Sequence, residues 1–218
     1  MLGHDPATVR AELRQRTGVV LQESGTDPYL TVREVVRKHA GYYRRPRDVD
    51  EVVALAELTE QASARVRTLS GGQRRRLDLA LAIVGNPELL FLDEPTTGFD
   101  PAARRTAWEL VRSLRALGKT VLLTTHYLDE AERLADRVAV IAQGRIVEVA
   151  TPATLGGRST AEAVVSWTAA DGVRQEVRTA TPTAEVARIA AGFDGEVPDL
   201  SVRRPSLEET YLAMVGEQ

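Results

Sequence analysis

The 218-residue sequence contains no cysteine, which excludes disulfide bonds and metal sites built on thiolates. It also has no long hydrophobic run. Apolar stretches such as 121–123 and 138–142 have the length of strands, and none in the sequence approaches the roughly 20 residues of a membrane-spanning helix. His4, Asp5 and Arg10 interrupt the region where a signal peptide would be apolar. The sequence therefore predicts a soluble chain.

An excess of charge of one sign is missing as well. The 28 Lys and Arg residues nearly balance the 31 Asp and Glu residues, which leaves a net charge of −3. Such a balance gives no general attraction to nucleic acids or to anionic lipids, so we expect no nucleic-acid partner. Hydrophobic residues make up 43% of the chain, enough for a buried core in one or two domains.

The middle of the chain alternates predicted strands with predicted helices. The run at 120–125 is continuously apolar or β-branched, which is typical of a parallel strand covered on both faces. Alternation of this kind predicts an α/β core. The predicted strands are 18–21, 89–92, 120–125 and 137–142, and the predicted helices are 6–16, 101–117 and 128–134 together with an apolar helix face at 77–84.

Two regions flank these elements or interrupt them. Residues 31–68 are charged and helical in pattern, with Thr31 and Glu34 at the spacing of a capping box. They form, with the helix that follows, a predicted helical subdomain over about 31–85. A glycine-rich linker at 156–160 then separates a predicted first domain, 1–155, from a small α+β accessory domain over 160–218.

The run Ser70-Gly71-Gly72-Gln73 opens a predicted helix. Two glycines allow a ligand to approach the backbone closely, and the free N–H groups and positive dipole end of a helix favour an anion. The Ser70 hydroxyl adds another donor. The alternative is an ordinary N-cap, since serine is common before a helix. These residues by themselves leave both interpretations open.

Polar residues follow three predicted strands. Asp93 and Glu94 come after 89–92, His126 after 120–125, and Gln22 after 18–21. Ligands bind at the carboxyl ends of parallel strands, where one carboxylate can hold Mg²⁺ and a neighbouring one can accept a proton from water. Each residue alone could be a solvated surface residue. Their shared placement favours a site.

These motifs, in this order, resemble the ATP-binding subunit of an ABC transporter over residues 1–150. Leu69 to Gln73 is similar to the family's signature motif, and Asp93 ends a segment similar to its Walker B strand. The remaining matches are Glu94 with the catalytic glutamate, Asp100 with the end of the D-loop, Gln22 with the Q-loop and His126 with the switch histidine.

The resemblance implies a fold, ligands and roles. The fold is a truncated P-loop NTPase core, the ligands are ATP and Mg²⁺, and a second ATP-binding subunit closes over ATP. By this resemblance Glu94 activates water and His126 contacts the γ-phosphate, while Asp93 and Gln22 bind Mg²⁺. ATP held by the other subunit is bound by the signature residues Ser70, Gly71, Gly72 and Gln73. Asp100 helps communicate between the paired sites.

Segments 73–80 and 205–212 resemble the drug-export branch, whose membrane partners are ABC-2 type permeases. This implies a cytoplasmic ATPase that energises export and lies at the inner face of the membrane through its permease. A soluble ABC protein that acts on ribosomes or DNA fits less well. Those proteins usually carry two cassettes or a large insertion, and the near-neutral charge gives no support for a nucleic acid.

The phosphate loop G-x-x-x-x-G-K-[S/T] is missing from these residues. Gly118-Lys119-Thr120 imitates its end, but Ser113 stands where the first glycine is required, and the loop must lead from a strand into a helix. We expect the phosphate-loop strand to lie beside the Walker B strand in the sheet. We expect a misassigned start at Met1 to be the reason why the loop is missing. The chain alone is therefore predicted to be inactive. The alternative is an inactive fragment or a non-hydrolysing partner that lends its signature motif.

Overall fold

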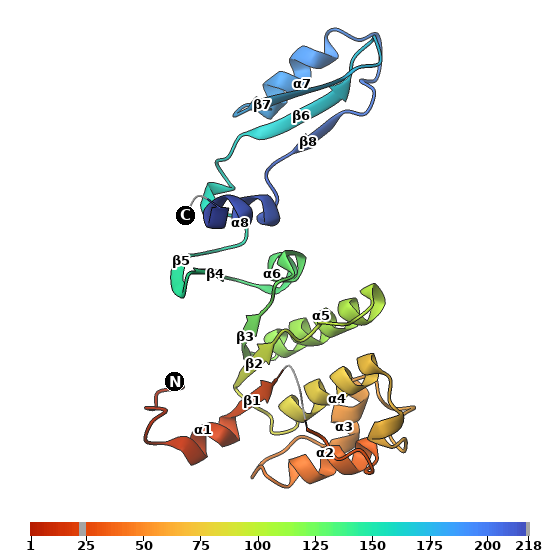
Figure 1. Cartoon of the computed structure of the whole chain (residues 1–218), viewed down its shortest axis with the longest axis vertical. Helices are drawn as coiled ribbons and strands as arrows, with labels where there is room; N and C mark the ends of the chain where they lie inside the picture. Colours follow the sequence, from red (N-terminus) through yellow and green to blue (C-terminus); the bar gives the residue numbers. More distant parts are fainter. Residues whose placement is uncertain (22–24, 217–218) are drawn as a thin grey trace. The chain divides into compact units, whose positions relative to one another are not determined.

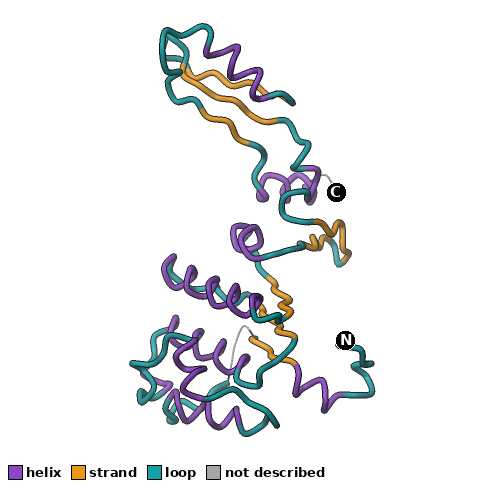
Figure 2. Tube along the Cα trace, turned by 180° about the vertical axis from the view of Figure 1, so that it is seen from behind, coloured by secondary structure: helices purple, strands orange, loops and turns teal. Residues whose placement is uncertain are grey.

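The computed structural model describes residues 1–21 and 25–216. Its contacts group into two compact units, Met1–His126 and Tyr127–Gln218, which are described separately (Figure 1). The sequence predicts a domain boundary at a different place, between 1–155 and 160–218. That domain division stays a prediction. Figure 2 shows the same elements from behind, coloured by type.

The first unit contains a three-stranded parallel sheet. Its strands are β1 (Thr17–Val20), β2 (Leu89–Asp93) and β3 (Thr120–Thr124), in the order β1-β2-β3. Both edges of β2 are therefore paired. The expectation that a phosphate-loop strand lies beside this Walker B-like strand is wrong, because a strand has only two edges and both are used. A further strand could join this sheet only beside β1 or β3.

The two faces of this sheet differ. Val20 and Leu92 are neighbours in register on one face and are buried there, on the side where α4 (Gly71–Ile83) packs. On the other face Val19 is 52% exposed and Leu122 is 56% exposed. Within this unit the prediction that 120–125 is covered on both faces is wrong, because the helices of the unit leave one face open and β3 has no buried residue.

Gly18 lets α4 approach β1 closely. A Cβ at this position would lie 2.1 Å from the carbonyl oxygen of Ala82 and 3.1 Å from Cδ2 of Leu90. We expect Gly18→Ala to lower the free energy of unfolding by about 2–3 kcal/mol, because backbone must shift to admit the methyl group. Urea unfolding measures this, with Gly25→Ala as the control, since a Cβ there meets nothing within 4 Å. Equal stability of the two variants would contradict the prediction.

Helices make up the rest of the first unit. They are α1 (Arg10–Arg16), α2 (Val32–Ala40), α3 (Val49–Leu55), the 3-10 turn η1 (Val66–Thr68), α4, and α5 (Pro101–Ala116). The capping box before α2 is confirmed: Glu34 Oε2 accepts from the Thr31 N–H at 2.8 Å, and the Thr31 hydroxyl accepts from the Glu34 N–H. The helix predicted over 6–16 begins only at Arg10. Residues 5–9 form a separate turn there, in which the main-chain carbonyl oxygen of Asp5 accepts from the N–H groups of Thr8 and Val9.

The second unit begins with α6 (Leu128–Leu134) and an antiparallel hairpin of β4 (Val138–Ala142) and β5 (Arg145–Ala150). Gln143 and Gly144 form the turn between these strands, and both residues have positive φ, which suits a two-residue hairpin turn. The other elements are η2 (Leu155–Gly157), β6 (Ala163–Thr168), β7 (Arg174–Thr179), α7 (Pro182–Ala190), β8 (Ser201–Arg203) and α8 (Leu207–Gly216). The last three strands form a sheet in the order β7-β6-β8.

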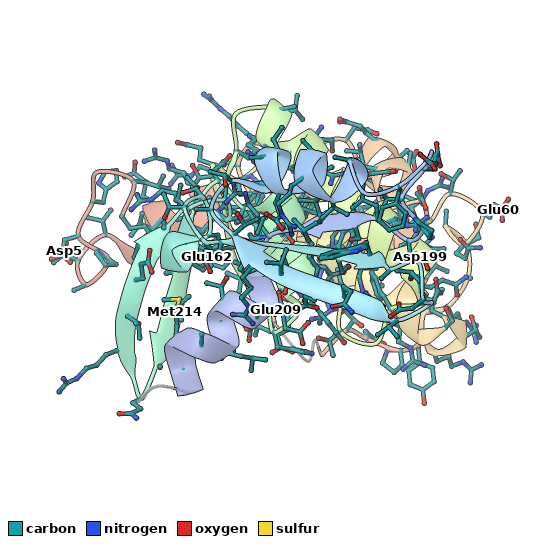
Figure 3. The ribbon with its side chains drawn as sticks, turned by 90° about the horizontal axis from the view of Figure 1, so that it is seen from above. Asp5, Glu60, Glu162, Asp199, Glu209 and Met214 are labelled. Atoms are coloured by element: carbon teal, nitrogen blue, oxygen red, sulfur yellow. The ribbon has the colours of Figure 1, made fainter. Side chains whose placement is uncertain are left out.

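The C-terminal helix α8 packs away from the β7-β6-β8 sheet. Its Leu207 is buried in one cluster with Ala131 of α6, Val140 of β4 and Leu155 of η2. Met214, labelled on α8 in Figure 3, packs against the same cluster. The helix at the end of the chain therefore shares its core with α6 and the β4–β5 hairpin.

The segment between η2 and α8 leaves this core and returns to it. Arg158 Nε donates to the carbonyl oxygen of Pro205 at 3.0 Å, and Arg204 Nη1 donates to that of Ala161 at 2.5 Å. The two ends of the segment that carries β6, β7, α7 and β8 are thus joined by hydrogen bonds.

Helix length and hydropathy bear on membrane insertion. Within residues 1–21 and 25–216, no helix has the length and apolar character needed to cross a lipid bilayer.

Candidate functional site

The turn that follows β2 carries two acidic residues. Asp93 is exposed at the end of the strand, and its Oδ1 accepts a hydrogen bond from the Thr124 hydroxyl of β3. Glu94 has a φ of 45°, the left-handed region that a non-glycine residue enters at a cost of about 1–3 kcal/mol. Its N–H donates to the carbonyl oxygen of Thr124 at 3.1 Å. Surrounding hydrogen bonds therefore hold a strained turn in place.

His126 approaches Glu94 from the end of β3. Its Nδ1 lies 3.1 Å from Glu94 Oε1, and the Thr97 hydroxyl donates to Glu94 Oε2 at 3.0 Å. The hydrogen bond from His126, and after it the one from Thr97, lowers the pKa of the Glu94 carboxyl. At neutral pH the group is therefore an ionised acceptor. The structure brings Asp93, Glu94 and His126 together at one sheet edge, as the sequence predicts.

The start of α4 shows how Ser70 and Gln73 are used. The Ser70 hydroxyl accepts from the Gln73 N–H at 3.2 Å, and Gln73 Oε1 accepts from the Ser70 N–H at 2.9 Å. This reciprocal pair is a capping box, so both side chains cap the start of α4. Of the two interpretations that the sequence left open, the helix cap is therefore present in the structure. The N–H groups of the first turn still carry the positive end of the helix dipole.

Gly71 and Gly72 are not required by packing inside the chain. A Cβ built on either residue meets nothing within 4 Å, and neither has a positive φ. Glycine is therefore unnecessary at both positions for folding of this unit, and the space beside them is open to a ligand.

Asp100 and Gln22 are the two remaining site residues predicted from the sequence. Asp100 caps α5: its Oδ1 accepts from the N–H groups of Ala102 and Ala103, each at 2.9 Å, and these bonds lower the pKa of its carboxyl. Gln22 lies outside the described residues. The roles predicted for both, and for the other site residues, stay predictions.

The predicted Mg²⁺ ligand Asp93 is exposed at the end of β2. The described part of the chain has no group of three His, Cys, Asp or Glu residues arranged for a metal. Mg²⁺ needs no such group when a nucleotide is present, since it usually binds one or two carboxylates together with phosphate oxygens and water. The exposed Asp93 carboxylate at the sheet edge fits a site of that kind.

Arg75 is a residue of this region that the sequence did not single out. It lies on α4, is only 8% exposed, and donates to four main-chain carbonyl oxygens, three at the end of β2 and the start of its turn and one just after β1. The available signal was helical spacing: Arg75 precedes the buried Leu79 by one turn, so it lies on a buried side of α4.

Comparisons with known proteins agree with this geometry. A family model described as ABC transporter matches residues 2–97. A Nod factor export ATP-binding protein I of Burkholderia thailandensis is 47% identical over 157 residues, which cover 69% of this chain and 52% of that protein. The chain thus spans about half the length of these relatives. A daunorubicin resistance ATP-binding protein of Streptomyces coeruleorubidus is 38% identical over an alignment of 247 positions, which covers 99% of this chain and 77% of that protein.

Two solved structures share the fold. An ATP-binding subunit of an ABC transporter superposes with a TM-score of 0.63 at 24% identity, covering 71% of this chain and 67% of that one. A dimeric ATP-binding cassette in a post-hydrolysis state, bound to ADP and phosphate, has a TM-score of 0.59 at 26% identity and covers 68% of each chain. These likenesses, with the matched helices and sheet, show an α/β ATPase core.

Proposed function

This chain belongs to the ABC transporter family of ATP-binding proteins, and from that premise we propose that it powers export of a drug or another small molecule through a separate ABC-2 type permease. The observation that carries the proposal is the cluster of Asp93, Glu94 and His126 at the carboxyl ends of β2 and β3. The names of the daunorubicin-resistance and Nod-factor relatives support export. Such a subunit works in the cytoplasm, at the inner face of the membrane.

The proposed reaction is hydrolysis of the γ-phosphate. The oxygen of a water molecule forms a bond to the γ-phosphorus, the bond from that phosphorus to the β–γ bridging oxygen breaks, and the water proton passes to the Glu94 carboxylate. ADP and inorganic phosphate leave. The position of the Glu94 carboxylate at the sheet edge, in contact with His126 and Thr97, supports this role.

His126 is proposed to contact the γ-phosphate. A neutral imidazole has a single N–H, so a neutral His126 that donates to Glu94 from Nδ1 has no hydrogen left to donate from Nε2. It therefore serves either Glu94 or the phosphate, and donating to both requires its protonated form. When bound, Mg²⁺ neutralises phosphate charge, and the residues proposed to hold it are Asp93 and Gln22.

The start of α4 is proposed to act on ATP held by a second subunit. The open space beside Gly71 and Gly72, together with the helix N–H groups there, supports binding of that γ-phosphate with Ser70 and Gln73. Asp100, at the start of α5, is proposed to help communicate between the paired sites.

The phosphate loop is proposed to lie outside these 218 residues. Because an ABC site needs such a loop to neutralise the phosphates, the 218-residue chain alone is expected to show no ATP hydrolysis above background. The second candidate function is a non-hydrolysing partner that lends its signature motif, and the free space at its two glycines favours it.

Mixing separates these candidates. The chain is added to a complete ATP-binding subunit whose own signature serine and glycines have been replaced, and phosphate release is measured. Restored hydrolysis supports lending of the signature motif by this chain. Failure of the mixture to hydrolyse ATP contradicts it, and turnover by the purified 218-residue chain would overturn the expected inactivity. Co-purification with an ABC-2 type permease, and stimulation of hydrolysis by transported drug, test the export role.

A further inference from the structure

Arg75 links three parts of the first unit through the main chain. Its Nη1 donates to the carbonyl oxygen of Leu21, just after β1, at 2.7 Å. Its Nη2 donates to the carbonyl oxygens of Asp93 at 3.0 Å and Glu94 at 2.7 Å, and its Nε to that of Pro95 at 3.2 Å. One buried guanidinium therefore holds the end of β1 together with the end of β2 and the start of the turn that follows it.

The chemistry of arginine suits this task. A guanidinium is planar, always charged, and presents five N–H donors in a fixed fork, so it can fix several acceptors in one plane at once. Its burial would be costly without such partners, and the carbonyl oxygens supply them. Since these oxygens belong to the backbone, Arg75 fixes where the chain runs there. The positions of the attached side chains follow from that path.

Glu94 depends on that path more than its neighbours do. Its φ of 45° is strained, and such a conformation persists only where several contacts hold it. Thr124 holds its N–H, and Arg75 holds its carbonyl oxygen. The carboxylate reaches His126 and Thr97 from this conformation. Losing the Arg75 contact frees one side of the residue.

Arg75 also lies on the helix whose first turn carries Gly71 and Gly72. Four residues of helix place Arg75 about 6 Å along the axis from Gly71, within one rigid turn. A shift of the first turn of α4 therefore moves the guanidinium, and with it the carbonyl groups of Asp93 to Pro95.

We propose that Arg75 is a positioning residue that couples the first turn of α4 to the turn of Glu94, and so holds the Glu94 carboxylate against His126. The catalytic meaning of this coupling rests on the proposed ATPase function. The coupling itself is a property of the nucleotide-free chain, so it can be tested separately.

The first test measures hydrogen exchange of the Glu94 N–H by NMR in the full chain without nucleotide, at one fixed pH. In the wild type this N–H, which donates to the carbonyl oxygen of Thr124, should exchange slowly, and in Arg75→Gln it should exchange about tenfold faster or more. Arg74→Gln is the matched control, because Arg74 donates to the carbonyl oxygens of Leu69 and Arg67. Arg75→Lys keeps the charge without the fork and is expected to raise the exchange rate part of the way.

A measurement on the wild type covers the case in which Arg75→Gln does not fold. A guanidinium fixed on both Nη groups rotates slowly, so the Nη protons of Arg75 should give separate NMR signals, correlated to its own Nε–H. Averaged Nη signals would overturn the proposal. So would a wild-type exchange rate of the Glu94 N–H in a folded Arg75→Gln variant.

The second test measures ATP hydrolysis in the mixture with the signature-deficient subunit or in the assembled transporter. Arg75→Gln is expected to lower kcat about 10²-fold, the cost of a small misplacement of a reacting group, with the KM for ATP changed less than about threefold. A raised KM with unchanged kcat would contradict positioning of Glu94. If the wild type itself shows no hydrolysis, the proposed function fails while the NMR tests still decide the coupling.

Discussion

Glu94→Gln is expected to lower ATP hydrolysis by the assembled transporter about 10²–10⁴-fold, the usual contribution of a general base. The substitution keeps the size of the side chain and an oxygen that can accept from Thr97 or His126, so the fold should be unchanged. What it removes is the negative charge that takes the water proton. Steady-state phosphate release at saturating ATP measures the effect.

The control for this experiment is Glu60→Gln. Glu60 is an exposed residue of the same unit and is labelled in Figure 3. The transporter that carries Glu60→Gln should hydrolyse ATP at the wild-type rate. Binding of ATP should survive in Glu94→Gln, because no predicted ATP contact is removed. A Glu94→Gln rate within threefold of the wild type would remove this residue from the reaction.

Gly72→Ala is expected to separate stability from activity. Alanine is favoured over glycine in a helix, and its methyl group meets nothing within 4 Å, so the free energy of unfolding should rise by about 0.5–1 kcal/mol. In the same variant the rate of ATP hydrolysis at the site of the second subunit should fall about 10²–10³-fold. The methyl group occupies the space through which a phosphate approaches the helix N–H groups, and those donors stabilise charge in the reaction.

Two measurements on the same preparation test this. Urea unfolding gives the stability, and phosphate release in the mixture with the signature-deficient subunit gives the activity. Gly216→Ala is the control, since its Cβ also meets open space, near the end of α8, far in sequence from the signature motif. A Gly72→Ala variant that keeps wild-type hydrolysis would show that the motif serves only as a helix cap.

The meeting of Asp93, Glu94 and His126 could be predicted because it follows from local order. Each residue ends a strand or follows it within two residues, and adjacent parallel strands bring their carboxyl ends to one edge. Turn and cap chemistry was predictable for the same reason: Thr31 with Glu34, and Gln143 with Gly144, act within a few residues of one another.

Features set by distant partners could not be predicted in this way. The pairing of β2 on both edges depends on contacts between residues 17–20, 89–93 and 120–124, which no local pattern encodes. Arg75 is one of three consecutive arginines in the sequence, and its carbonyl partners become visible only once the backbone after β1 and after β2 is in place. The return of α8 to α6 depends on Leu207 meeting Ala131, far apart in sequence.

The two hydrogen bonds that join Arg158 to Pro205 and Arg204 to Ala161 give the second unit the topology of a host and its insert. The host is built from α6, the β4–β5 hairpin, η2 and α8, and the insert leaves and re-enters it at one point. For such a segment, the entropy of closing the host chain grows only with the logarithm of the insert's length. The β7-β6-β8 sheet can therefore lengthen, shrink or be exchanged during evolution at little cost to the folding of the host.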